Sequence, residues 1–240
     1  MTIVYISRHS QPFRKLLGEY KVNEIEQIRN EKNPLSVDGE KYADQMSNYP
    51  ELLKVESLYS SHYVRAMATA KYIAEKNGIE LNVDERLGER RFGVDKMSEL
   101  PSNFFEEQFR NWDYKLSKGE SANEVSKRMN EALSEILDSN KGKVIAIISH
   151  GTAISTMLKK WCDIKLNEET KLIEIYFNNK LVFDGNWKCP ELFKAEFDDT
   201  NNLINIENIK YNWGKIWNYI KVNIKNLLIE KLVCLNGIIV

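Results

Sequence analysis

Short apolar runs recur along the first 150 residues, and each ends abruptly in polar residues. Residues 3–6, 57–61, 81–83 and 144–148 are too short for helices and are rich in β-branched, aromatic or other apolar side chains, which predicts strands. Between them, the spacing of apolar residues predicts helices from about residue 35 through Met46, over 63–76, from Ser121 and from Ala153 to about Trp161. Alternating strands and helices predict an α/β fold: a three-layer sandwich whose mostly parallel central sheet is flanked by helices.

Residues that favour helix ends support these boundaries. Ser36 is a predicted N-cap, and Ser121 with Glu124 has the spacing of a capping box. Asn77-Gly78 closes the helix before it, because glycine readily adopts the left-handed conformation that ends helices.

Beyond residue 165 the alternation stops. Residues 171–177 and 192–197 are predicted strands with no helix between them, which indicates an antiparallel edge to the sheet. Residues 95–119 carry aromatic side chains among many charges and predict a partly helical excursion outside the core. Residues 11–34 are polar and show no clear pattern.

The last thirty residues have a composition of their own, rich in Lys, Asn, Trp and Ile. Ile216, Ile220 and Ile224 recur at helical spacing with lysines between them. We therefore predict a catalytic domain over residues 1–207 and a C-terminal amphipathic helical extension over 208–240. Three roles stay open for this helix: docking on its own domain, forming a homodimer contact, or attaching to a membrane surface.

Composition excludes several function classes. The chain has 240 residues, 42% of them hydrophobic and 29% charged, with a formal net charge of -1. This is ordinary for a globular protein and argues against a general nucleic-acid binder. The three cysteines lie far apart without metal-binding spacing, and no signal peptide or bilayer-length apolar run occurs, so we expect a cytoplasmic protein without stable membrane insertion.

Two of the three histidines occupy equivalent places. His9 and His150 each follow the end of a predicted buried strand, and Arg8 precedes the first of them. Arg65 lies near the start of the helix that follows another strand. Because ligands bind at the carboxyl ends of strands in open α/β sheets, these cationic and imidazole side chains can meet there. Such a group suits an anion, and a phosphate monoester is the natural candidate.

Five segments, in order, resemble the signature of the histidine phosphatase (phosphoglycerate mutase-like) superfamily. They cover roughly residues 1–200 and are weak singly but strong together. The segments are Arg8-His9-Ser10, Ser60-Ser61-His62-Tyr63-Val64-Arg65-Ala66 with Thr69-Ala70, Leu87-Gly88-Glu89-Arg90-Arg91-Phe92-Gly93, Gly119-Glu120-Ser121 and Ser149-His150-Gly151.

The resemblance implies a role for each matching residue. His9 would be the nucleophile that carries a transient phosphoryl group, and Glu89 would be the general acid and then the base. Arg8, Arg65 and His150 would bind the phosphoryl oxygens together with His9 and neutralise their charge. No metal and no other cofactor is implied, because the cationic side chains do the work that magnesium does elsewhere.

Three departures from the family pattern bear on function. Ser10 replaces the usual glycine, which would cost stability if that position needs a positive φ. Residues 11–15 lack the Ser and Asn with which the mutase branch holds phosphoglycerate, which favours a phosphatase acting on a small phosphorylated metabolite. Residues 94–96 also depart from the pattern. The segment that covers the substrate in the family therefore does not indicate here which substrate is bound.

Several readings stay open. One is a phosphomutase, and another is a module that binds phosphorylated partners without turnover. A phosphatase acting on proteins is a further alternative, because the aromatic segment 104–112 could contact a peptide.

Overall fold

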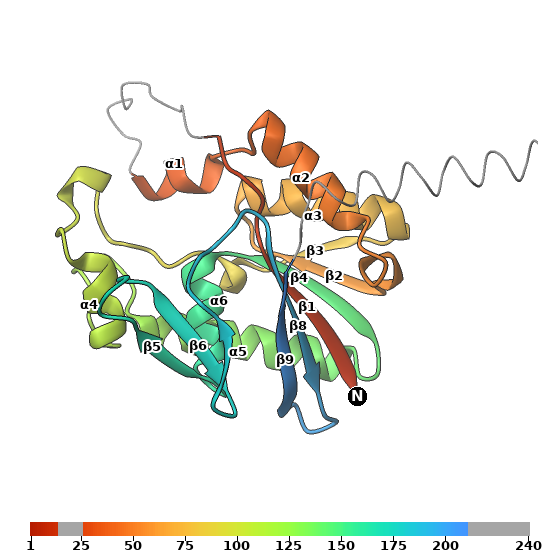
Figure 1. The fold of residues 1–240 in the computed structure, drawn as a ribbon. Coiled ribbons are helices and arrows are strands. Elements are labelled where there is room, and N and C mark those ends of the chain that lie inside the picture. Colours follow the sequence, from red (N-terminus) through yellow and green to blue (C-terminus); the bar gives the residue numbers. More distant parts are fainter. Residues whose placement is uncertain (14–25, 211–240) are drawn as a thin grey trace, which may run out of the picture. The chain divides into compact units, whose positions relative to one another are not determined.

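A computed structural model of the chain describes residues 1–13 and 26–210, and its compact unit spans Met1–Ile209 (Figure 1). The predicted C-terminal helix, and with it the homodimer contact, lies almost wholly outside the described residues and stays a prediction. Within the described residues, no helix combines the length and the apolar character needed to cross a bilayer.

The central sheet confirms the predicted α/β fold. Its six strands run in the order β3-β2-β4-β1-β8-β9, and the first four of these are mutually parallel. β8 runs antiparallel to β1, and β9 antiparallel to β8, which forms the expected antiparallel edge. The strands are β1 (Thr2–Arg8), β2 (Ser57–Ser60), β3 (Leu81–Val83), β4 (Val144–Ser149), β8 (Glu191–Phe197) and β9 (Leu203–Ile209).

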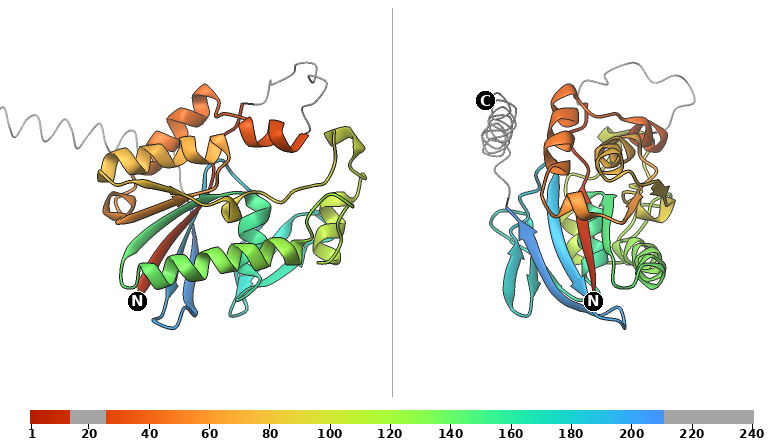
Figure 2. Two further views of the ribbon diagram at one scale, coloured as in Figure 1. Left: turned by 180° about the vertical axis from the view of Figure 1, so that it is seen from behind. Right: turned by 90° about the vertical axis from the view of Figure 1, so that its right-hand side faces the viewer.

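Helices cover both faces of this sheet, which makes the three layers (Figures 1 and 2). Alternate residues of β1 point to opposite faces. Val4 and Ile6 belong to the core cluster that includes apolar residues of α5 and α6, whereas the Ser7 hydroxyl lies 3.3 Å from the Met46 sulfur of α2. The helices are α1 (Glu26–Lys32), α2 (Val37–Ser47), α3 (Val64–Asn77), α5 (Ala122–Ser139) and α6 (Gly151–Leu158).

The local signals explain the helix ends. The Ser36 hydroxyl accepts from the Gly39 amide at 2.9 Å, and Ser121 forms the predicted capping box with Glu124. Gly78 ends α3 with a φ of 63°. α6 begins at Gly151, two residues before the predicted start, because His150 is its N-cap.

The segment after residue 160 differs from the prediction. The predicted strand at 171–177 joins a separate antiparallel sheet rather than the main one, in the order β5-β6-β7. Its hairpin turn is Asn178-Asn179, whose φ angles of 50° and 63° suit a tight turn between strands. The strands are β5 (Asp163–Leu166), β6 (Ile173–Phe177) and β7 (Lys180–Phe183).

The charged excursion is partly helical, as predicted, but it builds a small core of its own. Phe104 at the start of α4 (Phe104–Arg110) is fully buried. Its ring lies edge-on to Phe92 and Phe105, with centroids 5.6 and 5.5 Å away. Three short 3₁₀ segments complete the described chain: η1 (Leu52–Lys54), η2 (Glu85–Leu87) and η3 (Met97–Glu99).

Candidate active site

The two predicted histidines meet at one edge of the sheet. β1 and β4 are adjacent and parallel, with Arg8 opposite Ser149, so the residues that follow them lie side by side. The rings of His9 and His150 are 5.0 Å apart between centroids, and both side chains are buried. The fold thus places both imidazoles at the carboxyl ends of the strands.

Arg65 joins the two rings. Its Nε donates to His9 Nε2 at 3.0 Å, and its Nη2 lies 3.3 Å from His150 Nδ1. Nη1 donates to the carbonyl of Asn30 in α1, and the guanidinium lies over the ring of Tyr63, 4.7 Å from its centroid. A buried guanidinium is thereby held by four different residues, which fixes its position beside both histidines.

The hydrogen bonds of His9 fix its tautomer. Its Nδ1 lies 2.7 Å from the carbonyl oxygen of Ser10, which can only accept, so Nδ1 carries the proton. Nε2 then keeps a lone pair, consistent with the bond that it accepts from Arg65. Burial, followed by the charges of Arg65 and Arg8, holds the pKa of His9 well below 6.5, although the bond to Ser10 opposes this. His9 is therefore a neutral imidazole with an unprotonated Nε2 at neutral pH.

His150 is neutral for the same reasons. Burial, then the charge of Arg65 and the proximity of His9, holds the pKa of His150 well below 6.5. Because Arg65 can only donate, His150 Nδ1 accepts, and Nε2–H donates to the Ser61 hydroxyl at 2.8 Å. Ser61 lies in the second of the five family-like segments, but its pairing with His150 could not be predicted from the sequence.

Arg8 stands at the end of β1 with donors to spare. Its Nη1 reaches the carbonyl of Lys188 only at 3.4 Å, and its guanidinium lies over Trp187 at 5.9 Å from the ring centroid. Its Nε is buried and meets no acceptor among the described residues. A buried guanidinium donor without an acceptor fits the predicted role of Arg8 in holding an anion.

Glu89 is held at the start of α6. Its Oε1 accepts from the amides of Arg90 at 2.9 Å and Ala153 at 3.1 Å, and the second of these lies in the first turn of α6. Both bonds use the same oxygen. Amides at a helix N-terminus are good donors to a carboxyl oxygen, so these contacts orient the Glu89 side chain.

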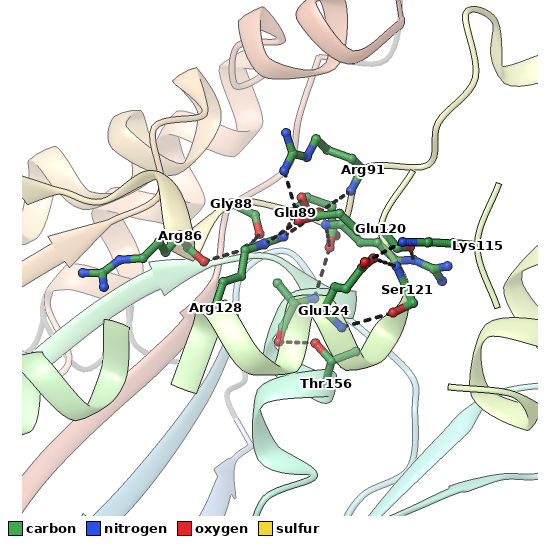
Figure 3. A network of polar contacts seen from close by, with 12 residues as sticks. Arg86, Gly88, Glu89, Arg91, Lys115, Glu120, Ser121, Glu124, Arg128 and Thr156 are labelled. Carbon is green, nitrogen blue, oxygen red and sulfur yellow. Dashed lines mark hydrogen bonds and ion pairs between the residues drawn. The ribbon is translucent and has the colours of Figure 1, made fainter. Parts of the chain in front are cut away.

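A buried ion pair holds the loop that carries Glu89 (Figure 3). Arg128 of α5 donates to the carbonyls of Arg86 at 2.6 Å, Gly88 at 2.9 Å and Glu89 at 3.2 Å. Glu120 orients Arg128 by accepting from its Nε at 2.8 Å and its Nη2 at 3.0 Å, and it also accepts from the Arg91 amide at 3.0 Å. We call Glu120 and Arg128 the loop clamp.

Ser10 takes the glycine position without backbone strain. Among the described non-glycine residues, a positive φ occurs only at Lys171, Asn178, Asn179 and Asn201. The Ser10 amide donates to the Thr69 hydroxyl at 2.9 Å, and its own hydroxyl donates to the Gly39 carbonyl at 2.7 Å. The side chain therefore contributes a buried hydrogen bond of its own.

Glu89 borders two cavities of different character. One, of about 280 Å³, is polar and is bordered by the loop clamp, Tyr63 and Arg91. The other, of about 360 Å³, is bordered by Arg8 and by aromatic side chains that include Trp187. A carboxylate between two cavities can reach a group in either of them.

Sequence reasoning missed several residues at this site. Trp187 lies in a segment without a motif. Asn30 lies in α1, which was not predicted because residues 11–34 are polar and show no apolar periodicity. Arg128 sits on the polar side of a predicted helix, where arginine is ordinary. A carboxylate and an arginine eight residues apart gave no usable signal, because Glu120 precedes the N-cap of α5 and eight residues is not a spacing at which helical side chains touch. Within the described residues, no three His, Cys, Asp or Glu side chains are grouped as a metal site would require.

Comparison with known proteins identifies the family. The profile of the histidine phosphatase superfamily (branch 1) matches residues 4–179. A protein named probable phosphoglycerate mutase GpmB, from Shigella dysenteriae serotype 1 (strain Sd197), is 28% identical over 204 residues, which cover 78% of this chain and 90% of that protein.

Solved structures share the fold. A mycobacterial glucosyl-3-phosphoglycerate phosphatase superposes with a TM-score of 0.60 at 17% identity, covering 88% of this chain and 98% of that one. A phosphoserine phosphatase mutant from Entamoeba histolytica, in complex with phosphoserine, gives a TM-score of 0.57 at 20% identity, covering 86% and 97%. The chain is thus similar in sequence to a protein named as a mutase and similar in fold to proteins named as phosphatases.

Proposed function

The chain belongs to the histidine phosphatase superfamily, and from that premise we propose that it hydrolyses phosphate monoesters through a phosphohistidine on His9. The observation that carries the proposal is the state of His9: a buried neutral imidazole whose Nε2 is unprotonated and lies between the arginine and the second histidine. A nucleophilic imidazole needs this tautomer and this low pKa.

In the first step, His9 Nε2 attacks phosphorus and the bond from phosphorus to the ester oxygen breaks. In the structure, Arg65 donates to Nε2. When a phosphoryl group binds, Arg65 donates to its oxygens instead, which frees the lone pair of Nε2 for attack. The donors of Arg8 and Arg65 neutralise the charge that spreads over the phosphoryl oxygens. A bound dianion also favours protonated His150, which then donates to the same oxygens.

Glu89 moves the proton in both steps. It gives a proton to the departing alkoxide, so that the alcohol leaves neutral. The carboxylate then takes a proton from a water molecule that attacks the phosphohistidine, which releases inorganic phosphate and restores His9. Its place beside the cavity that Arg8 borders supports this role.

We further propose that the reaction needs no metal ion. Arg8 and Arg65 supply the two guanidinium groups that charge neutralisation requires, and both stand beside the nucleophile. Guanidinium groups bind phosphate with two parallel hydrogen bonds, which orients it as well as neutralising it.

A phosphomutase is the second candidate, and the curated relatives named as probable phosphoglycerate mutases favour it. Against it stands the segment after Ser10. Residues 11–15 lack the Ser and Asn with which the mutase branch holds phosphoglycerate, and the first of these residues pair through their backbone with residues 34 and 35. Hydrolysis of a small phosphorylated metabolite remains the better reading, and the cytoplasmic location remains a prediction.

The test is hydrolysis of an aryl phosphate in the presence of EDTA, between about pH 5 and pH 8. Wild type should release phosphate, and His9→Ala should release none. Glu89→Gln should form an acid-labile phosphoenzyme and stall, because an aryl leaving group needs little protonation whereas the attacking water needs the base.

Three outcomes would contradict the proposal. If His9→Ala forms the same phosphoenzyme as wild type, the nucleophile is wrong. If wild type binds inorganic phosphate yet forms no phosphoenzyme and no product, the chain is a phosphate-binding module. Phosphoryl transfer from the phosphohistidine to added phosphoglycerate that outpaces transfer to water would identify a mutase.

A further inference from the structure

The cavity beside Arg8 and Glu89 has an apolar wall. Its volume of about 360 Å³ lies within the range of roughly 300–1,000 Å³ that is usual for small-molecule sites. Two parts of the chain, far apart in sequence, build this wall. Its apolar side chains are Phe92, Phe105, Phe109, Leu172, Ile173 and Trp187.

The aromatic rings are held firmly by others behind them. Phe92 and Phe105 lie edge-on to each other with centroids 5.6 Å apart, and both lie edge-on to the fully buried Phe104. Trp187 packs against Phe183, with centroids 4.6 Å apart, and a Cβ at Gly151 would lie only 3.4 Å from its ring. Rings fixed in this way can receive another ring with little loss of conformational freedom.

Three polar side chains of this wall have partners. The Ser155 hydroxyl donates to the Gly151 carbonyl, and the Gln108 amide accepts from Arg90 and donates to the Phe105 carbonyl. The Lys171 ammonium lies 2.9 Å from Glu168 and 3.6 Å from Glu106. The wall therefore presents mainly apolar surface, and its lysine lies in an exposed ion-pair cluster in which Glu168 and Glu106 also pair with Arg110.

We propose that this cavity binds the alcohol part of the substrate and that the substrates are phosphate monoesters of uncharged alcohols carrying an aromatic ring. This inference rests on the proposed function: Arg8 holds the phosphoryl group and Glu89 protonates the leaving oxygen, and both border the same cavity. The group attached to that oxygen must then enter the space between the aromatic side chains. A phosphoglycerate would bring a carboxylate to a wall whose lysine is already paired.

The test compares two esters of primary alcohols, 2-phenylethyl phosphate and ethyl phosphate, so that the leaving groups differ in the ring and little in basicity. We expect wild type to prefer the phenyl ester by at least about tenfold in kcat/KM. Phe105→Ala should reduce that ratio by about tenfold, since one aromatic contact is commonly worth close to a factor of ten. Phe105 is 49% exposed, so the variant should fold, and Phe105→Leu should keep part of the preference.

Ile204→Ala is the matched control, because Ile204 is 48% exposed on β9, outside the cavity wall, and should leave the ratio unchanged. Calorimetry with 2-phenylethylphosphonate and ethylphosphonate measures the same preference without turnover. Equal kcat/KM for the two esters, or an unchanged ratio in Phe105→Ala, would overturn the aromatic site while the phosphatase stands. No turnover together with preferred binding of the phenyl phosphonate would overturn the phosphatase and support the aromatic site.

Discussion

Glu120→Gln tests how the loop that carries Glu89 is held. Glu120 is buried and receives two hydrogen bonds from Arg128, at 2.8 and 3.0 Å, and one from the Arg91 amide at 3.0 Å. Glutamine keeps the shape but loses the charge, and its amide group turns a donor toward Arg128 or Arg91. Arg128 then has no anion to orient it, and its three bonds to the loop carbonyls loosen (Figure 3).

The expected size of the effect follows from burial. Removing one partner of a fully buried ion pair costs about 3–5 kcal/mol. The Arg128 side chain is 17% exposed, so water can solvate part of its charge, and we expect a loss of about 2–3 kcal/mol. At roughly 2–4 °C per kcal/mol for a domain of this size, Tm should fall by about 4–12 °C. Because a small displacement of a catalytic group costs up to about 100-fold, kcat should fall by about 10- to 100-fold.

The split between kcat and KM shows whether the clamp positions Glu89. Arg8 and Arg65 do not touch Glu120, so KM for a phosphate ester should change little while kcat falls. Glu124→Gln is the matched control: Glu124 lies one turn away and caps α5 through the Ser121 amide at 2.8 Å. Glutamine can keep this capping-box bond, so the variant should cost less than about 1 kcal/mol, with kcat nearly unchanged.

The pH dependence provides a second readout. Burial alone would raise the pKa of Glu120, but the bonds and charge of Arg128 and the bonds from Arg91 outweigh it and hold the pKa below 4.5. A lowered pKa in the folded state adds stability above pH 4.5 that is lost as the pH falls through the folded pKa. Wild type should lose this stability on acidification, and Glu120→Gln should not. The reasoning fails if kcat of Glu120→Gln matches that of Glu124→Gln.

Three further predictions concern single groups at or near the site. Gly93→Ala should lower the free energy of unfolding by about 2–4 kcal/mol, as measured with urea. Gly93 has a φ of 82°, and a Cβ there would lie 2.3 Å from the Gly119 amide nitrogen. An unchanged unfolding midpoint would contradict this. Ser10→Gly should keep kcat/KM but lower stability by about 1–2 kcal/mol, since the Gly39 carbonyl loses a buried donor at 2.7 Å, and equal or higher stability would show that backbone strain dominates instead. Because the pKa of His9 is lowered, kcat/KM should stay high as the pH falls past 6.5. The stability that the neutral imidazole contributes is fully present above pH 6.5 and is lost as the pH falls toward the folded pKa. A pH–rate profile with its acid limb at 6.5 or above would refute the neutral buried imidazole.

Much of the fold could be predicted because its signals are local. The apolar runs of β1 and β4, the capping box at Ser121 and the closing Gly78 each act within a few residues. The separate three-stranded sheet was missed because β5 and β7 are short and half-exposed, which leaves little apolar pattern. A signal did exist: Asn178-Asn179 between two runs of alternating residues is typical of a tight hairpin turn.

The candidate site divides in the same way. His9, His150, Arg8 and Arg65 could be named in advance, because a fold with parallel strands brings strand ends to one edge of the sheet. Glu89 could be named only through the resemblance to the histidine phosphatase superfamily. The loop clamp and the aromatic cavity could not be predicted, because they join residues of η2, α4, α5 and the segment before β8. These residues are not spaced at any regular interval along the chain.

The sequence by itself determined the parallel strands of the main sheet and the helices that connect them, the sheet edge at which the histidines and arginines meet, and the family to which the chain belongs. The tertiary structure decided that His9 and His150 are neutral, since only packing takes their rings out of water and sets guanidinium charges beside them. It also decided that Ser10 fits without strain and that an aromatic cavity adjoins Arg8. Burial and distance act through space, and residues far apart in the sequence acquire both only when the chain has folded.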